Sequence, residues 1–185
     1  MRWRLLWALA PLGLIGLFLA LSGAPAVAAK HTLIGKQLPE FSQQTSNDWL
    51  NSEPLQVEAL RGQVVLIDFW AFGCWNCYRS FPWLNQLEEK FTGKPFRIIG
   101  VHSPEFSHEK DRAKLAEKIA EFKLKHPVMV DNDFVFWRAM HNKYWPSYYI
   151  IDKSGVIRGF YAGETHKGDS QDRRISSLIS RLLKE

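Results

Sequence analysis

The chain contains two cysteines, Cys74 and Cys77, which are separated only by Trp75 and Asn76. Two thiols at this spacing can form a structural disulfide, supply half of a metal site or act as a redox pair. A disulfide that closes about four residues contributes only ~2 kcal/mol, which adds little to a domain with its own core. A tetrahedral zinc site needs three or four ligands, and the six histidines show no paired metal spacing. A copper site that combines both cysteines with His102 remains open.

The surroundings of the cysteines favour the redox pair. Cys74 follows an apolar run at 63–71 and opens a helical pattern, and the amide groups at a helix start stabilise a thiolate. Cys77 lies one turn further on, where it can resolve a mixed disulfide. Asp68 interrupts the apolar run six residues before Cys74, and a buried acid is costly unless it has a partner or a role. It is either a strand-edge carboxylate in water or a proton acceptor for Cys77.

The elements that position these residues alternate along the chain. Continuous β-branched and aromatic runs predict buried strands at 63–71, 96–103 and 127–131, and residues 35–41 resemble an initial strand and loop. Helical spacing predicts helices from the cysteines to Thr92-Gly93, over 107–125, over 133–144 with an Asp or Asn cap, and around 175–182. A turn at 152–155 predicts a hairpin within 147–163. This order predicts an α/β fold with a mixed central sheet, parallel at first and antiparallel late, flanked by helices.

Composition limits the class of protein. A chain of 185 residues with 46% hydrophobic and 23% charged residues is typical of one globular domain with a sizeable core. The formal net charge is +5, and without Arg2 and Arg4 it is +3, with both signs interspersed along the body. A small excess of positive charge with both signs interspersed does not indicate the basic patch of a nucleic-acid-binding protein.

The first 28 residues read as a targeting segment. Arg2 and Arg4 precede an apolar run over 5–21, and small residues with the pattern Ala-x-Ala follow. This is the pattern of a signal peptide that is cleaved after Ala28, although the run approaches the ~20 residues of a membrane anchor. Both alternatives place residues 29–185 outside the cytoplasm, where disulfides persist.

Several motifs together resemble a known family. "VVLIDFWAFGCWNC" at 64–77, with Pro82 inside the following helix, is similar to the active-site strand, CxxC motif and kinked helix of the thioredoxin fold. "VHSPEF" at 101–106, "HPVMVD" at 126–131 and "YWPSYYIIDKSGVIRGFYAGE" at 144–164 resemble the TlpA/ResA-like envelope thioredoxins, most closely the C-terminal domain of DipZ-type membrane proteins. The resemblance covers about residues 35–183.

The resemblance implies roles at two further positions, Pro146 and Glu105. Pro146 falls where this family has a cis-proline facing the CxxC motif, and the Trp145 backbone would pair there with a substrate chain. Glu105 falls where ResA-like proteins carry an acid near the active site, although a solvated loop carboxylate is an equal alternative. Trp75, with Trp145 and Phe72, would form an apolar docking surface or pack in the ordinary way.

The chain also departs from thioredoxin in ways that affect its chemistry. Trp75 and Asn76 replace the Gly-Pro of thioredoxin, and Gly73 replaces the tryptophan that commonly precedes the first cysteine. Because Asn76 restores a backbone N–H near the helix start, we expect the Cys74–Cys77 pair to be less reducing than thioredoxin. A measured potential at or below that of thioredoxin would contradict this expectation.

These patterns predict an exported thiol-disulfide oxidoreductase in which Cys74 attacks, Cys77 resolves and Asp68 manages the proton. By resemblance it reduces protein disulfides in the envelope, at the periplasmic or outer face of the cytoplasmic membrane, for example in cytochrome c maturation, with electrons from a membrane thiol transporter. We expect a monomer that needs no bound cofactor. Alternatives are an oxidant that forms or shuffles disulfides and a copper carrier. A peroxidase is disfavoured because the pair is a CxxC and no Pro/Thr-rich loop carries a lone cysteine.

Overall fold

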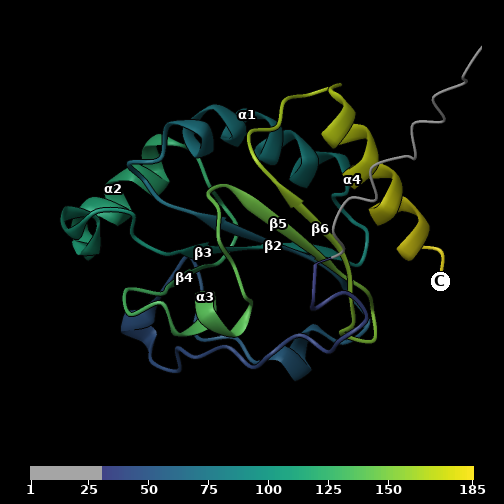
Figure 1. The fold of residues 1–185 in the computed structure, drawn as a ribbon, viewed down its shortest axis with the longest axis horizontal. Coiled ribbons are helices and arrows are strands. Elements are labelled where there is room, and N and C mark those ends of the chain that lie inside the picture. Colours follow the sequence, from purple (N-terminus) through teal and green to yellow (C-terminus); the bar gives the residue numbers. More distant parts are fainter. Residues whose placement is uncertain (1–30) are drawn as a thin grey trace, which may run out of the picture.

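The computed structural model describes residues 31–185 and shows a six-stranded sheet in the order β1-β4-β3-β2-β5-β6 (Figure 1). The segment predicted to be a signal peptide, residues 1–28, lies outside the described residues. The strands are β1 (Trp49–Leu50), β2 (Val64–Trp70), β3 (Phe96–His102), β4 (Val128–Val130), β5 (Ser147–Ile151) and β6 (Ile157–Ala162). The central strand β2 is buried at every position, which explains its nearly continuous apolar sequence.

The sheet is mixed, as the order of the elements predicts. β2 pairs in parallel with β3, and β3 pairs in parallel with β4. β5 runs antiparallel to both β2 and β6, so the late hairpin extends the same sheet, and the short β1 is antiparallel to β4. The carboxyl end of β2 therefore lies beside the end of β3 and the start of β5, and this is where the cysteines follow.

Helices cover both faces of the sheet. They are α1 (Trp75–Lys90), α2 (Arg112–Glu121), α3 (Val135–Ala139) and α4 (Ser170–Leu182). In Figure 1, α1 and α4 lie above the sheet and α3 lies below it. Because side chains alternate along a strand, Leu66 and Trp70 of β2 pack in the core beneath α1, whereas Ile67 and Phe69 pack in the core on the α3 side.

The structure corrects several details of the sequence expectations. The helix predicted over 107–125 is split into a 3₁₀ turn (Ser107–Lys110) and α2, because Asp111 has extended dihedral angles and caps α2 with its carboxylate. The N-cap residue of α3 is Phe134, whose side chain makes no capping hydrogen bond. The Asp131 carboxylate accepts the N–H groups of Phe136 and Trp137 instead.

Two strand predictions also change. The initial strand expected at 35–41 is reduced to one isolated bridge between Gln37 and Val156. The pattern of residues 30–54 gave no sign of β1, because two residues are too few to show an alternation. Within residues 31–185, no helix is both long enough and apolar enough to span a bilayer.

Candidate active site at the Cys74–Cys77 pair

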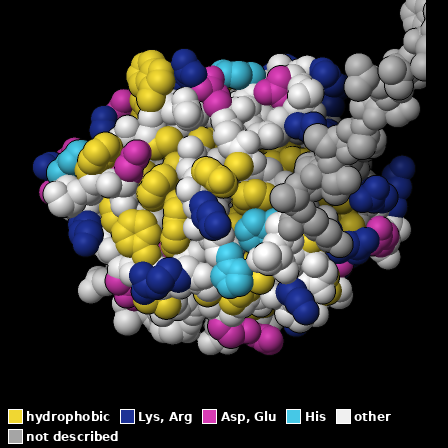
Figure 2. Space-filling view, viewed as in Figure 1, with side chains coloured by type: hydrophobic (Ala, Val, Ile, Leu, Met, Phe, Trp, Pro, Cys, Tyr) yellow, Lys and Arg dark blue, Asp and Glu magenta, His cyan; other side chains and the backbone are white. Residues whose placement is uncertain are grey.

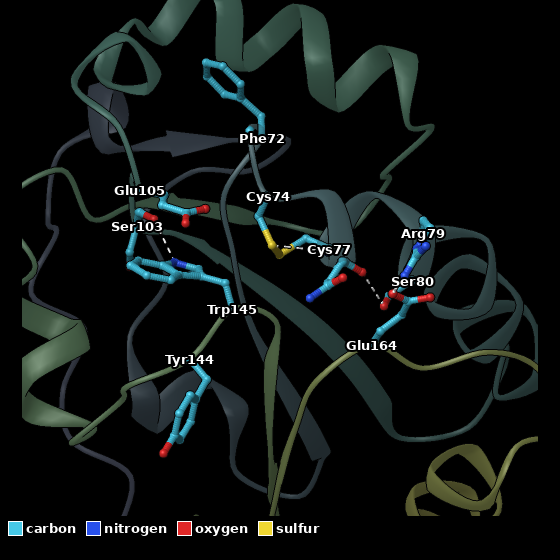
Figure 3. Close-up of a disulfide and its surroundings, with 12 residues drawn as sticks. Phe72, Cys74, Cys77, Arg79, Ser80, Ser103, Glu105, Tyr144, Trp145 and Glu164 are labelled. Carbon is cyan, nitrogen blue, oxygen red and sulfur yellow. Dashed lines mark hydrogen bonds and ion pairs between the residues drawn. A yellow bond between two sulfur atoms is a disulfide. The ribbon is translucent and has the colours of Figure 1, made fainter.

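Cys74 and Cys77 form a disulfide at the start of α1 (Figure 3). Cys74 is the N-cap residue, with extended backbone angles, and its Sγ accepts a hydrogen bond from the Cys77 backbone N–H at 3.2 Å. Cys74 is 7% exposed, whereas Cys77 is fully buried. The outer sulfur therefore meets a helix N-terminus and an N–H donor, which stabilise a thiolate, and it is the one that a partner can reach.

Asp68 is a buried acid on the α1 side of the sheet. It shares the face of β2 that carries Leu66 and Trp70, and its side chain is 1% exposed, so it is not a strand-edge carboxylate in water. Its Oδ1 has no hydrogen-bond partner within residues 31–185, and the neighbouring Tyr148 hydroxyl has none either. Burial raises the pKa of Asp68 to about 8, so this carboxyl can take up or release a proton near neutral pH.

The Trp145–Pro146 peptide bond is cis, as the resemblance implies. The Trp145 indole N–H donates to the backbone oxygen of Ser103 at 2.9 Å, a bond that is visible in Figure 3. The partly buried Trp145 ring packs against the core cluster that contains both cysteines, and its other neighbour is Trp137, with ring centroids 4.3 Å apart. The turn before β5 is thus fixed beside the disulfide.

Asp131 holds this turn through Ser103, a role that the sequence did not indicate. Its fully buried carboxylate accepts the Ser103 hydroxyl at 3.1 Å and the backbone N–H groups of Phe136 and Trp137 at 3.0 and 2.8 Å. Burial raises the pKa of Asp131, although the three hydrogen bonds oppose that rise. The end of β3, the start of α3 and the Trp145 turn are therefore joined through one carboxylate.

The acid buried next to the cysteine loop is Glu109 and not Glu105. The Glu105 side chain is exposed, and only its backbone N–H takes part in the site, by donating to Glu109 Oε2 at 2.5 Å. Glu109 is fully buried, and its Oε1 accepts the N–H of Gly73, the residue before Cys74. The only sequence signal for Glu109 is an acid three residues after the start of a turn, a common capping position.

Exposed aromatic side chains surround the disulfide, and we call Trp75, Phe106 and Tyr144 the aromatic rim. They are 65%, 52% and 56% exposed. Trp75 stacks on Tyr78 with ring centroids 5.5 Å apart. Hydrophobic side chains also gather on the left half of the face in Figure 2, where α2 and α3 lie in Figure 1. Phe72, by contrast, is partly buried and stacks on His102.

His102 is buried beneath Phe72 and does not join the cysteines in a ligand cluster. Its Nε2 accepts the Phe72 backbone N–H at 3.4 Å, and burial lowers its pKa to about 3, so the ring is neutral. In the described part of the chain, no group of three or more His, Cys, Asp or Glu side chains is placed to hold a metal ion.

Comparisons with known proteins agree with this geometry. Residues 34–160 match the AhpC/TSA family. The chain is 30% identical to the thiol-disulfide oxidoreductase YkuV of Bacillus subtilis (strain 168), over 80% of this chain and 95% of YkuV. It is 38% identical to protein DipZ of Mycobacterium tuberculosis over 63% of this chain, and 38% identical to the chloroplastic protein SUPPRESSOR OF QUENCHING 1 of Arabidopsis thaliana over 76%. The matched region spans only 17% and 13% of those two longer relatives.

Solved structures show the same fold. A thioredoxin-like protein in its oxidised form superimposes with a TM-score of 0.66 at 30% identity, over 80% of this chain and 96% of the other. A thiol-disulfide isomerase from Corynebacterium glutamicum superimposes with a TM-score of 0.66 at 24% identity, over 80% and 97%. The chain therefore belongs to the AhpC/TSA family, has the thioredoxin fold and is similar to thiol-disulfide oxidoreductases of the TlpA/ResA-like group.

Proposed function

We propose that this protein is an exported reductase that reduces protein disulfides in the cell envelope. The observation that carries the proposal is a proton acceptor, Asp68, buried beneath the helix that begins at Cys74 and Cys77. A thiol-disulfide oxidoreductase needs this combination, because its second thiol must lose a proton before it can close the disulfide.

The first step is attack on the substrate. In the reduced protein, the Cys74 thiolate attacks one sulfur of a substrate disulfide, so a Cys74–substrate bond forms and the substrate S–S bond breaks. The departing substrate sulfur leaves as a thiolate and takes a proton from solvent. The helix N-terminus and the Cys77 N–H, which reaches Cys74 Sγ at 3.2 Å, stabilise the attacking thiolate.

The second step closes the protein disulfide. Asp68 accepts the proton of the Cys77 thiol, and the Cys77 thiolate attacks Cys74 Sγ. The Cys74–Cys77 bond forms, the mixed disulfide breaks, and the second substrate sulfur leaves and is protonated. The substrate has then gained two electrons and two protons, which the cysteine pair has lost, and a dithiol donor restores the pair by the reverse exchange.

The substrate chain would lie across the cis Trp145–Pro146 turn, with the aromatic rim contacting its apolar residues. An unfolded cytochrome c with an oxidised haem-binding CxxC is an example of such a substrate, and a membrane thiol transporter is the corresponding donor. We further propose that residues 1–28 export or anchor the protein. The name of the thiol-disulfide oxidoreductase YkuV supports the class of chemistry, whereas the substrate and the donor are our proposals.

Insulin reduction, with dithiothreitol as donor, tests the chemistry. We expect turnover by the native protein, no turnover by Cys74→Ser, and an accumulated mixed disulfide with Cys77→Ser, because that variant can attack but cannot resolve. Equal behaviour of the two variants would overturn the assignment of roles.

The direction of electron flow is tested by trapping the in-cell redox state of the Cys74–Cys77 pair with an alkylating reagent. A mainly reduced pair supports the reductase, and a mainly oxidised pair would identify an oxidant instead.

A further inference from the structure

Glu109 combines deep burial with a position beside the cysteine loop. It lies in the 3₁₀ turn Ser107–Lys110, in which it is the only buried residue. Its neighbours His108 and Lys110 are exposed. A buried carboxylate in an otherwise exposed turn is costly unless specific partners hold it.

Those partners are backbone N–H groups from two separate segments. Glu109 Oε1 accepts the N–H of Gly73, in the connection between β2 and α1. Glu109 Oε2 accepts the N–H groups of Glu105 and Phe106, in the connection that follows β3, at 2.5 and 3.0 Å. One carboxylate therefore joins the residue before the attacking cysteine to a loop that is more than 30 residues away in the sequence.

The charge of Glu109 is not neutralised by a basic side chain. Within residues 31–185, no Lys, Arg or His nitrogen lies within 4 Å of its carboxylate. Both oxygens accept hydrogen bonds, which fits the ionised form, since an ionised carboxylate can only accept. The titratable groups nearest to it in the chain, Glu105, His108, Lys110 and Asp111, make no hydrogen bond to its side-chain oxygens except through the Glu105 backbone.

We propose that Glu109 is a positioning residue for the Cys74–Cys77 pair, which fixes the backbone before Cys74 and makes the pair more reducing. Reduction of the pair adds two electrons and two protons to the disulfide and leaves Cys74 as a thiolate when it ionises. A negative charge beside the preceding residue disfavours that thiolate, and it also occupies the Gly73 N–H, which could otherwise turn toward the sulfur. Glu109 thus opposes the stabilisation supplied by the helix start. This inference rests on the proposed disulfide exchange.

Gly73 supports the assignment independently. A Cβ at this position would collide with Glu109 Oε1 and would lie 3.5 Å from the Phe106 ring. Only glycine therefore lets the carboxylate reach the backbone before Cys74. The replacement of the usual tryptophan by Gly73 is accounted for by this close approach.

Glu109→Gln tests the proposal with little change of shape. The amide oxygen can still accept from Glu105 and Phe106, but its NH₂ group then faces the Gly73 N–H, so the charge and that hydrogen bond are both lost. We expect the Cys74 thiol pKa, measured from the pH dependence of alkylation, to fall by about half a unit or more. That shift corresponds to about three-fold more thiolate below the pKa. At pH 8.5, the equilibrium with glutathione should move toward the reduced pair by about two-fold or more.

Glu117→Gln is the matched control. Glu117 is an exposed acid on α2, with no side-chain hydrogen bond within the described residues, so the same loss of charge should leave the thiol pKa unchanged. An unchanged thiol pKa and equilibrium in Glu109→Gln would overturn the proposal, even if the melting temperature fell, because the role would then be purely structural.

Gly73→Ala provides a second route if Glu109→Gln does not fold. Its Cβ displaces the carboxylate and should shift the thiol pKa in the same direction, and the absence of that shift would also overturn the proposal. A native protein that exchanges with neither insulin nor glutathione would instead overturn the proposed function. The two failures are therefore distinguishable.

Discussion

Asp68 shows how one buried residue couples chemistry to stability. Among the residues that the structure describes, its Oδ1 has no hydrogen-bond partner, and burial raises its pKa from 3.8 to about 8. The folded protein therefore holds the proton more tightly than the unfolded chain does. This group stabilises the fold fully below about pH 4, and that contribution is lost as the pH rises through 8. In the proposed mechanism, the same acid accepts the Cys77 proton during resolution.

Asp68→Asn should separate these two effects. We expect the variant to gain stability over the native protein as the pH rises from 4 to 8, by up to about 1.4 kcal/mol per pH unit, because it has no charge to bury. At pH 7 we expect resolution to slow by about 10²-fold, since the proton acceptor is lost. Urea unfolding at pH 5 and pH 9, and the lifetime of the mixed disulfide, measure the two quantities.

Asp152 is a control for Asp68, because its pKa is shifted in the opposite direction. Burial raises its pKa, but the hydrogen bonds from Ser154, Arg158 and the Val156 backbone outweigh burial, and the net pKa is lowered. Asp152→Asn should therefore lose stability at neutral pH and leave resolution unchanged. A pH-independent difference between Asp68→Asn and the native protein would contradict the argument from burial.

Trp75 is the residue of the aromatic rim best placed to contact a partner. It lies between the two cysteines in the sequence, and 65% of it is exposed. Trp75→Ala should raise KM for reduction of a protein disulfide by about five-fold or more, because it removes a large apolar contact. The rate with oxidised glutathione should stay within about two-fold, since this small polar disulfide offers little apolar surface for the indole to contact. Val135→Ala, at an exposed apolar residue on α3, should change neither rate.

At the scale of elements, the carboxylate of Asp131 joins β3 to α3 and, through Ser103, to the Trp145 turn. Asp131→Asn places an NH₂ group against N–H donors, so we expect a loss of about 1–3 kcal/mol in unfolding free energy and a lower rate of disulfide exchange. Ser103→Ala is the matched control. It removes only the bond between Asp131 and Ser103 and keeps both bonds from Asp131 to α3, so we expect a smaller loss of stability and rate than in Asp131→Asn. Equal loss of rate in both variants would contradict the role given to Asp131.

The sequence predicted those elements whose signal is local. β2 and β3 are continuous apolar runs, and the structure places their ends within one residue of the prediction. The cis bond before Pro146 was implied by the family resemblance and is present in the structure. Glu109 and Asp131 could not be predicted, because each carboxylate accepts a hydrogen bond from a segment distant in the sequence. These donors are the Gly73 N–H and the Ser103 hydroxyl, which only the folded chain brings close. The helix over 107–125 was wrong because the capping propensity of Asp111 outweighs the apolar periodicity.

At the scale of the whole molecule, we expect the fold to persist when the disulfide is reduced. Apolar cores cover both faces of the sheet, with Leu66 in one and Phe69 in the other, and the disulfide closes a loop of only a few residues. The free energy of closing the disulfide nevertheless differs between folded and unfolded chains. By a thermodynamic cycle, that difference equals the difference in unfolding free energy between the oxidised and reduced proteins. Each 30 mV of difference in reduction potential between the folded and unfolded chains corresponds to about 1.4 kcal/mol.

The relative stability of the oxidised and reduced proteins therefore indicates whether the protein reduces or oxidises its substrate. A reductase stabilises its oxidised form more, so we expect the oxidised native protein to unfold at a higher urea concentration than the reduced protein. The buried charge of Glu109 contributes to this difference in stability by disfavouring the Cys74 thiolate. Glu109→Gln should therefore reduce the difference in stability between the oxidised and reduced proteins. Both forms should still unfold cooperatively, because both cores persist. A reduced form that is the more stable of the two would show that the folded protein favours its dithiol and acts as an oxidant.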